Sequence, residues 1–192
     1  MPRLFVAIDF PESVSNRLDE IAYGLQGAAW VHQYHLTLRF LGEMDESARV
    51  EIQHALMDVR TESFHVDLKG VGHFPLRGNP EVLWVGVEQN PALMRLNRRM
   101  ESALARAGVS PETRKFHPHV TLARLKNGAS RHAGDFEVLH SLFKVSEIPV
   151  EGFHLYSSRL TPEGAVHTVE ETYPLEGMLQ GDLEYGDNRE YG

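Results

Sequence analysis

Hydrophobic positions along the chain repeat with two different periods, which predicts a fold that mixes strands and helices. Residues 3–9 alternate between apolar and other positions, as a strand does. Pro11 then stands at a favourable first position for a helix, whose apolar stripe continues at helical spacing until Gly27 ends it. Residues 35–40 alternate again and are followed by Gly42, so we expect a second strand there.

Two later helices have recognisable ends. Asp45 can cap the first of them, and Asn90 can cap the second, with Pro91 at its first position and Gly108 after its last turn. A short helix is expected over 135–143. The remaining patterns predict strands near 64–71, near 81–88, from 119 onward, near 148–157 and near 165–173.

The end of the chain differs in composition from the rest. Residues 176–192 hold five acidic residues, one basic residue and several glycines. Such a segment buries too little apolar surface to fold by itself, so we expect a flexible acidic tail. We expect residues 1–175 to form a single domain built of two lobes, which suits a chain of 192 residues.

One short motif occurs twice. His-x-Thr-Leu begins at His35 and again at His119, each time in a predicted strand. Because side chains alternate along a strand, each histidine shares a face with the threonine two residues later, Thr37 or Thr121. The apolar residues between them face the other way and can pack on a helix. Two similar lobes facing one another would bring the two motifs together.

Two such motifs around one phosphorus atom suit phosphoryl transfer. An imidazole titrates near pH ~6.5, so one histidine can accept a proton from water while the other protonates a departing oxygen. The hydroxyls of Thr37 and Thr121 can donate hydrogen bonds to the non-bridging oxygens, where negative charge is held in the transition state. A single His-x-Thr on a strand is usually structural, so the repetition carries this interpretation.

Composition and charge narrow the possible partners. The net charge is −8 for the whole chain and −4 for residues 1–175, which argues against a wide surface for duplex DNA. It leaves room for a site that holds one phosphate at the end of a strand. No apolar run approaches the ~20 residues of a membrane span, so we expect no membrane partner. The absence of cysteine permits a reducing cytoplasm, which we expect as the location.

Around the two motifs the sequence resembles the two-histidine (2H) phosphoesterase superfamily, and within it the RNA 2',3'-cyclic phosphodiesterase family, also called the 2'-5' RNA ligase family. The resemblance covers the chain from about Arg3 to Leu175 and rests on collinear segments. These are Arg-Leu-Phe-Val-Ala-Ile from Arg3, His-Leu-Thr-Leu-Arg-Phe-Leu-Gly from His35, Gly-Val-Gly-His-Phe-Pro from Gly70, Val-Leu-Trp-Val-Gly-Val from Val82, Phe-His-Pro-His-Val-Thr-Leu-Ala-Arg from Phe116 and Leu-Tyr-Ser-Ser-Arg-Leu-Thr from Leu155.

The resemblance implies an α+β fold of two lobes related by a pseudo-two-fold axis, with two mainly antiparallel sheets, outer helices and a central groove. It implies hydrolysis of a terminal RNA 2',3'-cyclic phosphate to a 2'-phosphomonoester, and in some relatives reversible 2'-5' joining of RNA ends. His35 would be the proton donor and His119 the proton acceptor, while Thr37 and Thr121 would bind the phosphate. The family often has tyrosine where this chain has His167.

Three further residues are candidates for the site. The family often has an arginine at the position of Arg124, but strict alternation places this residue on the face opposite His119. It therefore reaches the phosphate only if the strand ends or twists first. Arg39 is expected on the face of His35, where it either helps to bind phosphate or is a solvated charge at the groove rim. Phe74 either stacks on a base or belongs to a small satellite core.

No metal or cofactor is expected. His117, His119 and His32 invite a metal interpretation, but Pro118 interrupts regular strand geometry and no acidic residue is spaced near them as a ligand. Cysteine ligands are absent from the sequence. The acid/base scheme with two histidines requires no metal ion.

Two other functions remain open at the level of sequence. One is a cyclic phosphodiesterase for a small nucleotide of the ADP-ribose cyclic phosphate type, which the acidic body mildly favours. The other is a module that binds RNA ends or nucleotides without turnover, although the intact pairs of histidines and threonines argue against it. We expect a monomer whose partner is an RNA 3' end, or a nucleotide, that carries a 2',3'-cyclic phosphate.

Overall fold

The computed structural model describes residues 3–22, 27–31, 33–74, 82–125, 133–161 and 164–177. His32 and residues 178–192 of the predicted tail lie outside this part of the chain. The described helices and strands follow one another in the order of an α+β fold, as the sequence predicts. No helix in the described ranges is both long and apolar enough to cross a membrane.

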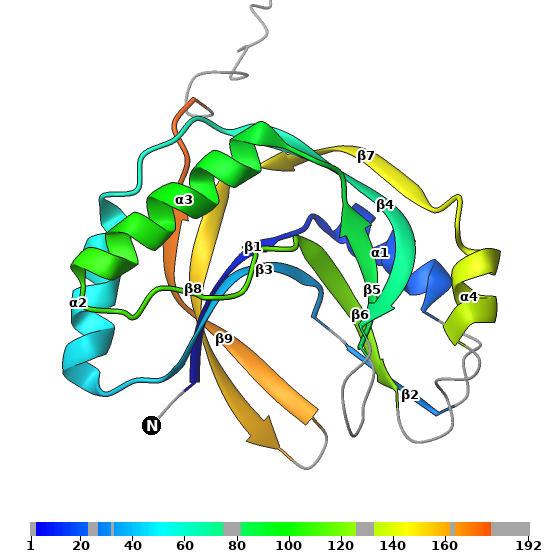
Figure 1. Ribbon diagram of the computed structural model, residues 1–192, viewed down its shortest axis with the longest axis horizontal. Helices are drawn as coiled ribbons and strands as arrows, with labels where there is room; N and C mark the ends of the chain where they lie inside the picture. The colour runs from blue at the N-terminus through cyan, green and yellow to red at the C-terminus, as the bar shows by residue number, and fades with distance from the viewer. Residues whose placement is uncertain are drawn as a thin grey trace, which may run out of the picture.

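The strands form one curved sheet in which every pairing between strands is antiparallel (Figure 1). Their order across the sheet is β7-β4-β5-β6-β3-β1-β8-β9, and β2 pairs with β6. The bounds are β1 Arg3–Asp9, β2 Ala28–Trp30, β3 His35–Glu43, β4 Phe64–Phe74, β5 Val82–Val87, β6 His119–Leu125, β7 Lys144–Val150, β8 Gly152–Thr161 and β9 Gly164–Pro174.

Apart from β2, the sheet consists of two halves of four strands each. β7-β4-β5-β6 forms one half and β3-β1-β8-β9 forms the other. A single pair, Leu36 opposite Val120, joins β3 to β6 at the centre. The expected two lobes are therefore present, and this one contact merges their sheets. The two His-x-Thr-Leu strands are the innermost strand of each half, which places the motifs side by side.

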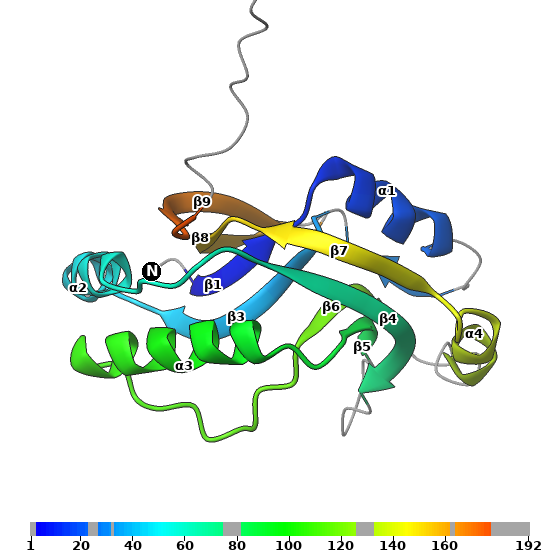
Figure 2. The same ribbon diagram turned by 90° about the horizontal axis from the view of Figure 1, so that it is seen from above.

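Helices cover the periphery of the sheet (Figures 1 and 2). Their bounds are α1 Glu12–Ile21, α2 Glu46–Met57, α3 Pro91–Arg106 and α4 Ala133–Leu139. The predicted caps of α2 and α3 are confirmed. Asp45 accepts a hydrogen bond from the amide of Ala48, and Asn90 accepts from the amides of Ala92 and Leu93. Such caps stabilise a helix because its first amides have no partner within it.

Some expected elements have different bounds in the structure, and one strand was not expected. The strand predicted near 148–157 is two strands, β7 and β8, which separate at Glu151. The short helix predicted over 135–143 begins earlier and ends at Leu139, before β7 starts. The short strand β2 was not predicted, because three residues give no periodicity to detect. It exists because it pairs with the outer end of β6.

The main core lies between the sheet and the helices. Leu36 and Val120 are fully buried there, together with Leu18 of α1 and Leu96 and Met100 of α3. Burying side chains of this size stabilises the fold by about 1.5–3 kcal/mol each, which outweighs any local preference in these short strands. Since Leu36 and Val120 face this core, the residues beside them on β3 and β6 face the opposite, concave side of the sheet.

Candidate active site

His35 and His119 lie next to the central bridge, on the concave side of the sheet. With Leu36 opposite Val120, an antiparallel register places His35 across from Thr121 and His119 across from Thr37. The four residues are half-buried, whereas the leucine and valine between them are buried on the other side. The predicted sharing of faces is thus confirmed, and the structure brings the two motifs together diagonally about one point.

Both imidazoles are held in the same way. Nδ1 of His35 lies 3.1 Å from the carbonyl oxygen of Gln33, and Nδ1 of His119 lies 2.7 Å from the carbonyl oxygen of His117. A carbonyl oxygen can only accept, so each Nδ1 carries the hydrogen and donates it. In the neutral ring this leaves Nε2 without a proton. Each histidine therefore has one nitrogen that fixes its orientation and one that is available for proton transfer.

A β-bulge interrupts each motif strand at its motif leucine. On β3, Thr37 pairs with Ala7 and Arg39 pairs with Val6, which leaves Leu38 as the extra residue. On β6, Thr121 pairs with Trp84 and Ala123 pairs with Leu83, which leaves Leu122 as the extra residue. A bulge shifts the alternation of side chains by one position. The two copies of the motif thus share a backbone irregularity at the same position as well as their residues.

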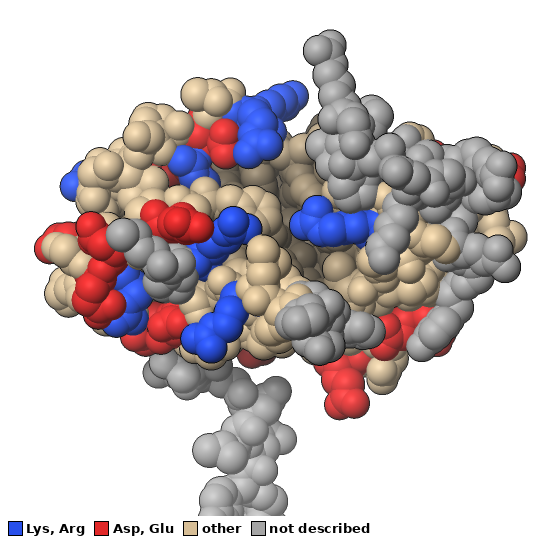
Figure 3. Space-filling model, turned by 90° about the horizontal axis from the view of Figure 1, so that it is seen from below, with Lys and Arg blue, Asp and Glu red and all other residues tan. Residues whose placement is uncertain are grey.

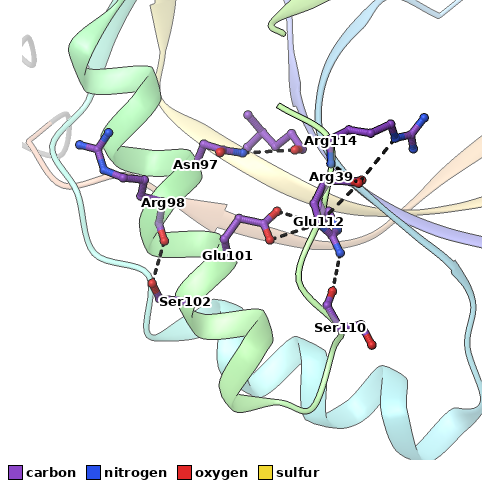
Figure 4. Close-up of polar contacts among 9 residues, drawn as sticks. Arg39, Asn97, Arg98, Glu101, Ser102, Ser110, Glu112 and Arg114 are labelled. Carbon is purple, nitrogen blue, oxygen red and sulfur yellow. Dashed lines mark hydrogen bonds and ion pairs between the residues drawn. The ribbon is translucent and has the colours of Figure 1, made fainter. Parts of the chain in front are cut away.

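The bulge on β3 overturns the expected position of Arg39. Its side chain is only 8% exposed and lies on the helix side of the sheet instead of on the face of His35. There it donates to the carbonyl oxygen of Ser110 at 2.6 Å and forms ion pairs with Glu101 at 3.2 Å and with Glu112 at 3.8 Å (Figure 4). Arg39 therefore joins β3 to α3 and to the segment that leads to His119.

The bulge on β6 has the opposite consequence for Arg124. Arg124 is exposed and pairs with Val82. Val82 lies two residues before Trp84 on β5, so the two side chains share one face of the sheet. Trp84 pairs with Thr121 on the concave side, so Arg124 faces that side too. The condition that strict alternation imposed on Arg124 is met because the bulge breaks the alternation. On β3 the corresponding position is Phe40, which is 62% exposed.

Aromatic rings surround His119. The ring centroid of Phe74 lies 4.9 Å from that of His119 at an angle of 85°, and Trp84 lies 5.2 Å from Phe74. Trp84 packs directly on the backbone of Gly72, where a Cβ would come within 2.5 Å of the indole. Glycine at this position thus allows the indole to lie flat beside the site. Phe74, predicted as a stacking residue, is adjacent to the candidate catalytic histidine.

Three residues beside His35 were not predicted as parts of the site. Ring centroids of Phe5, His167 and Tyr156 lie 5.0, 5.2 and 6.2 Å from that of His35. The Tyr156 hydroxyl donates to Asp9, which also lies near His35. The departure from the family pattern at His167 was the one signal in the sequence that pointed here. Phe5 and Tyr156 reach the site through strand pairings that no local pattern encodes.

Burial determines the protonation of the two histidines. It is the main cause that lowers the pKa of His35 from 6.5 to about 4, and the positive charge that His167 can carry contributes to the same shift. Burial is also the main cause that lowers the pKa of His119 and that of His167. Hydrogen bonds from the two Nδ1 atoms to backbone carbonyls oppose these shifts. At neutral pH both imidazoles of the free protein are therefore uncharged.

The concave side of the sheet is hollowed. Viewed from below, a depression with largely uncharged walls crosses the middle of the molecule, and Lys or Arg side chains lie on both of its flanks (Figure 3). A low-dielectric floor with positive charge at the sides favours an anionic ligand over a neutral one. The described residues contain no group of three His, Asp or Glu placed to hold a metal ion, and His32 of the metal interpretation lies outside them.

Comparison with known proteins gives consistent results. The family model of the 2'-5' RNA ligase superfamily matches residues 10–161. An RNA 2',3'-cyclic phosphodiesterase of Thermotoga maritima is 38% identical over 185 residues, which are 92% of this chain and 97% of that protein. An RNA 2',3'-cyclic phosphodiesterase of Aeropyrum pernix is 38% identical over 143 residues, 70% of this chain and 77% of that protein.

Solved structures share the fold. A crystal structure of a Thermus thermophilus protein superposes with a TM-score of 0.74 at 33% identity and covers 92% of this chain and 99% of that one. The crystal structure of Escherichia coli LigT complexed with 3'-AMP superposes with a TM-score of 0.71 at 25% identity, covering 92% of this chain and 100% of LigT. The α+β fold with two lobes that the sequence predicts is thus confirmed.

Proposed function

This chain belongs to the 2'-5' RNA ligase superfamily, and on that premise we propose that it hydrolyses the 2',3'-cyclic phosphate at the 3' end of RNA. The observation that carries the proposal is the arrangement of two imidazoles about one point, each fixed through Nδ1 by a backbone carbonyl. The relatives named RNA 2',3'-cyclic phosphodiesterase support the choice of substrate. A hollow with uncharged walls and flanking positive charge suits a phosphate anion.

The proposed mechanism divides the proton transfers between the two histidines. His119 takes a proton from water through Nε2 as the water oxygen bonds to phosphorus. His35 gives a proton to the 3' oxygen as the bond from phosphorus to that oxygen breaks. The products are a 2'-phosphomonoester and a free 3' hydroxyl. Each proton transfer is worth typically about 10²–10⁴ in rate.

The threonines act on the same phosphate. Thr37 and Thr121 face the concave side between the histidines, where their hydroxyls can donate to the non-bridging oxygens. Arg124 adds a positive charge on the same face. These contacts strengthen as negative charge accumulates on the phosphate, so they stabilise the transition state more than the bound substrate.

We expect Thr121→Val to lower kcat/KM about 10- to 100-fold, because a hydrogen bond to a charged oxygen is worth about 1.5–3 kcal/mol. Thr121→Ser keeps the hydroxyl and is the matched control, with a loss of less than about tenfold. Steady-state kinetics on a 2',3'-cyclic nucleotide measure both. Full activity in Thr121→Val would show that the hydroxyl is not needed, and equal losses in the two variants would show that the methyl group matters as much as the hydroxyl.

Binding of the substrate must favour the uptake of a proton from solvent by His35. The pKa of His35 is about 4 in the free protein, so this ring is neutral at physiological pH. A phosphodiester anion against Nε2 favours the charged imidazolium and raises its pKa. The proton donor is thus formed when the substrate binds, and the hydrophobic burial that lowers the pKa makes the imidazolium a strong acid.

The pH dependence of the reaction follows from these shifts. Above pH 4 the protonated fraction of His35 falls, whereas the neutral fraction of His119 rises until its own lowered pKa is passed. We therefore expect a bell-shaped profile of kcat/KM with its maximum between pH 4 and 6.5. The profile of kcat should lie at higher pH, since bound substrate raises the pKa of His35. A kcat/KM that is flat from about pH 5 to 9 would contradict a two-histidine mechanism.

The proposed function is tested by assaying purified protein on RNA ending in a 2',3'-cyclic phosphate, with and without EDTA. We expect a 2'-phosphate product whose rate of formation EDTA leaves unchanged. The rate of hydrolysis of a 2',3'-cyclic mononucleotide is measured in parallel. The comparison shows how much the RNA beyond its last nucleotide contributes to the rate. Binding of both ligands without product would instead indicate a nucleotide-binding module.

A further inference from the structure

A second concave site lies away from the two histidines, between α3 and the segment that follows α2. It has a volume of about 520 Å³. Five arginines line it: Arg60, Arg95, Arg98, Arg99 and Arg106. One acidic residue, Asp58, belongs to the same lining. Such a convergence is unexpected in a chain with a net charge of −8, and we refer to it as the arginine pocket.

The spacing of the arginines along α3 produces this convergence. Arg95, Arg99 and Arg106 are four and then seven residues apart, so they form one stripe on the helix surface, and Arg98 stands beside it. From the segment after α2, Arg60 completes the ring, and Arg99 donates a hydrogen bond to the Arg60 backbone carbonyl. The contact fixes one guanidinium against the neighbouring segment and keeps the pocket's two walls together.

The positive charge of the pocket is not neutralised by the fold. None of its five arginines forms an ion pair with any described acidic residue. Glu101 of α3 is directed to the opposite side, where it pairs with the buried Arg39 (Figure 4). Like charges three and four residues apart repel one another along a helix. Solvated helix faces usually relieve this repulsion with acidic residues at those spacings, but the one acidic residue of α3, Glu101, pairs with Arg39 instead.

We propose that the arginine pocket binds phosphates of the RNA backbone upstream of the reacting 3' end. Guanidinium groups contact phosphate oxygens in pairs, with directional hydrogen bonds. Among the described residues of its lining there is no aromatic side chain on which a base could stack. Contacts of this kind depend on charge and not on sequence, which suits an enzyme for RNA ends of varied sequence.

The two sites share no residue, because the lining of the arginine pocket includes none of the residues around the two histidines. The view from above shows α3 running beside the segment that joins α2 to β4, where the arginine pocket lies (Figure 2). The hollow of the concave side appears in the view from below (Figure 3). A single nucleotide in the hollow therefore leaves the pocket empty, and only a longer strand that passes around the α3 side reaches both. Affinity should increase with RNA length.

The proposal rests on the proposed function for its choice of RNA, but binding can be measured without any hydrolysis. The probe is a 5'-labelled single-stranded RNA of 20 nucleotides with an ordinary 3' hydroxyl, and the measurement is fluorescence anisotropy at several salt concentrations. The test variant is Arg95→Gln with Arg99→Gln. The matched control is Arg3→Gln with Arg17→Gln, which also removes two positive charges from exposed positions outside the pocket.

We expect the pocket variant to bind the 20-nucleotide RNA about tenfold more weakly at moderate salt, with the control unchanged. The slope of log affinity against log salt should fall by about 1.4, or about 0.7 for each phosphate of the single strand that the variant no longer binds. Hydrolysis of a 2',3'-cyclic mononucleotide should remain at the level of the unmodified protein, which also shows that the variant is folded. Circular dichroism gives the same check if the protein hydrolyses nothing.

Three results would overturn the proposal. The first is unchanged RNA affinity in the pocket variant, and the second is an equal loss in the control, which would indicate a general effect of net charge. In a competition arm, inorganic polyphosphate should displace the RNA, and an oligoglutamate of equal charge should not. Displacement by oligoglutamate at equal charge concentration would be the third, because it would favour an acidic protein segment as the natural occupant.

Discussion

Replacing His119 with alanine is expected to lower kcat/KM for a 2',3'-cyclic nucleotide by about 10²–10⁴, and His35→Ala should cost about as much. Each variant removes one of the two proton transfers. It leaves the strands in place, because both side chains lie on the concave side and outside the core that Leu36 and Val120 help to form. Initial rates on the nucleotide, measured between pH 5 and 8, provide the comparison.

The structure supplies a control for this experiment. His54 lies exposed on the last turn of α2, outside both motifs, and belongs to none of the ring contacts around the site. His54→Ala should leave kcat/KM within about twofold of the unmodified protein. The double variant His35→Ala with His119→Ala should be little slower than the slower single variant, since the two groups act in one step. Retention of more than a tenth of the activity in either single variant would refute the assignment.

The second large effect concerns stability. Arg39→Met is expected to lower the free energy of unfolding by about 3 kcal/mol, within the range for breaking a buried ion pair by removing one partner. The substitution keeps the apolar stem and removes the guanidinium. Glu101 and Glu112 then lose their shared cation, and the carbonyl of Ser110 loses its donor. Urea unfolding followed by circular dichroism measures the change.

Arg114→Met is the matched control for Arg39→Met. Arg114 also pairs with Glu112, at 3.5 Å, but its side chain is 83% exposed. Exposed pairs contribute about 0–1 kcal/mol, so this variant should be close to the unmodified protein. Losses of equal size in the two variants would contradict the importance of burial. Combining Arg39→Met with Glu101→Leu should recover part of the loss, because the double variant no longer leaves that carboxylate without its cation.

The role of Arg39 links stability to the site. The guanidinium contacts Ser110 and Glu112 in the segment between α3 and β6, which leads directly to His119. Its own strand, β3, begins with His35. One buried side chain therefore fixes the two halves of the sheet relative to each other near the point where both histidines meet. The sequence left Arg39 as either a phosphate ligand or a solvated charge at the groove rim, whereas its burial and its contacts with Ser110, Glu101 and Glu112 point to a positioning role.

Much of the fold could be predicted because the signals for it are local. The caps at Asp45 and Asn90 hydrogen-bond to amides within three residues, so a few letters of sequence determine them. The alternation that turns Leu36 and Val120 inward depends only on strand geometry and on apolar side chains. The strand β2 was missed because its three residues are ordered by pairing with β6 and not by a pattern of their own.

By itself, the sequence determined the two His-x-Thr motifs, the strands that carry them and the faces on which the histidines and threonines lie, because each of these follows from neighbouring residues. The positions of Arg39 and Arg124 were decided only by the tertiary structure. A bulge arises where two paired strands accommodate different numbers of residues, so neither strand alone contains the information. The same holds for His167 and Tyr156 beside His35, which strands more than a hundred residues later in the chain bring to the site.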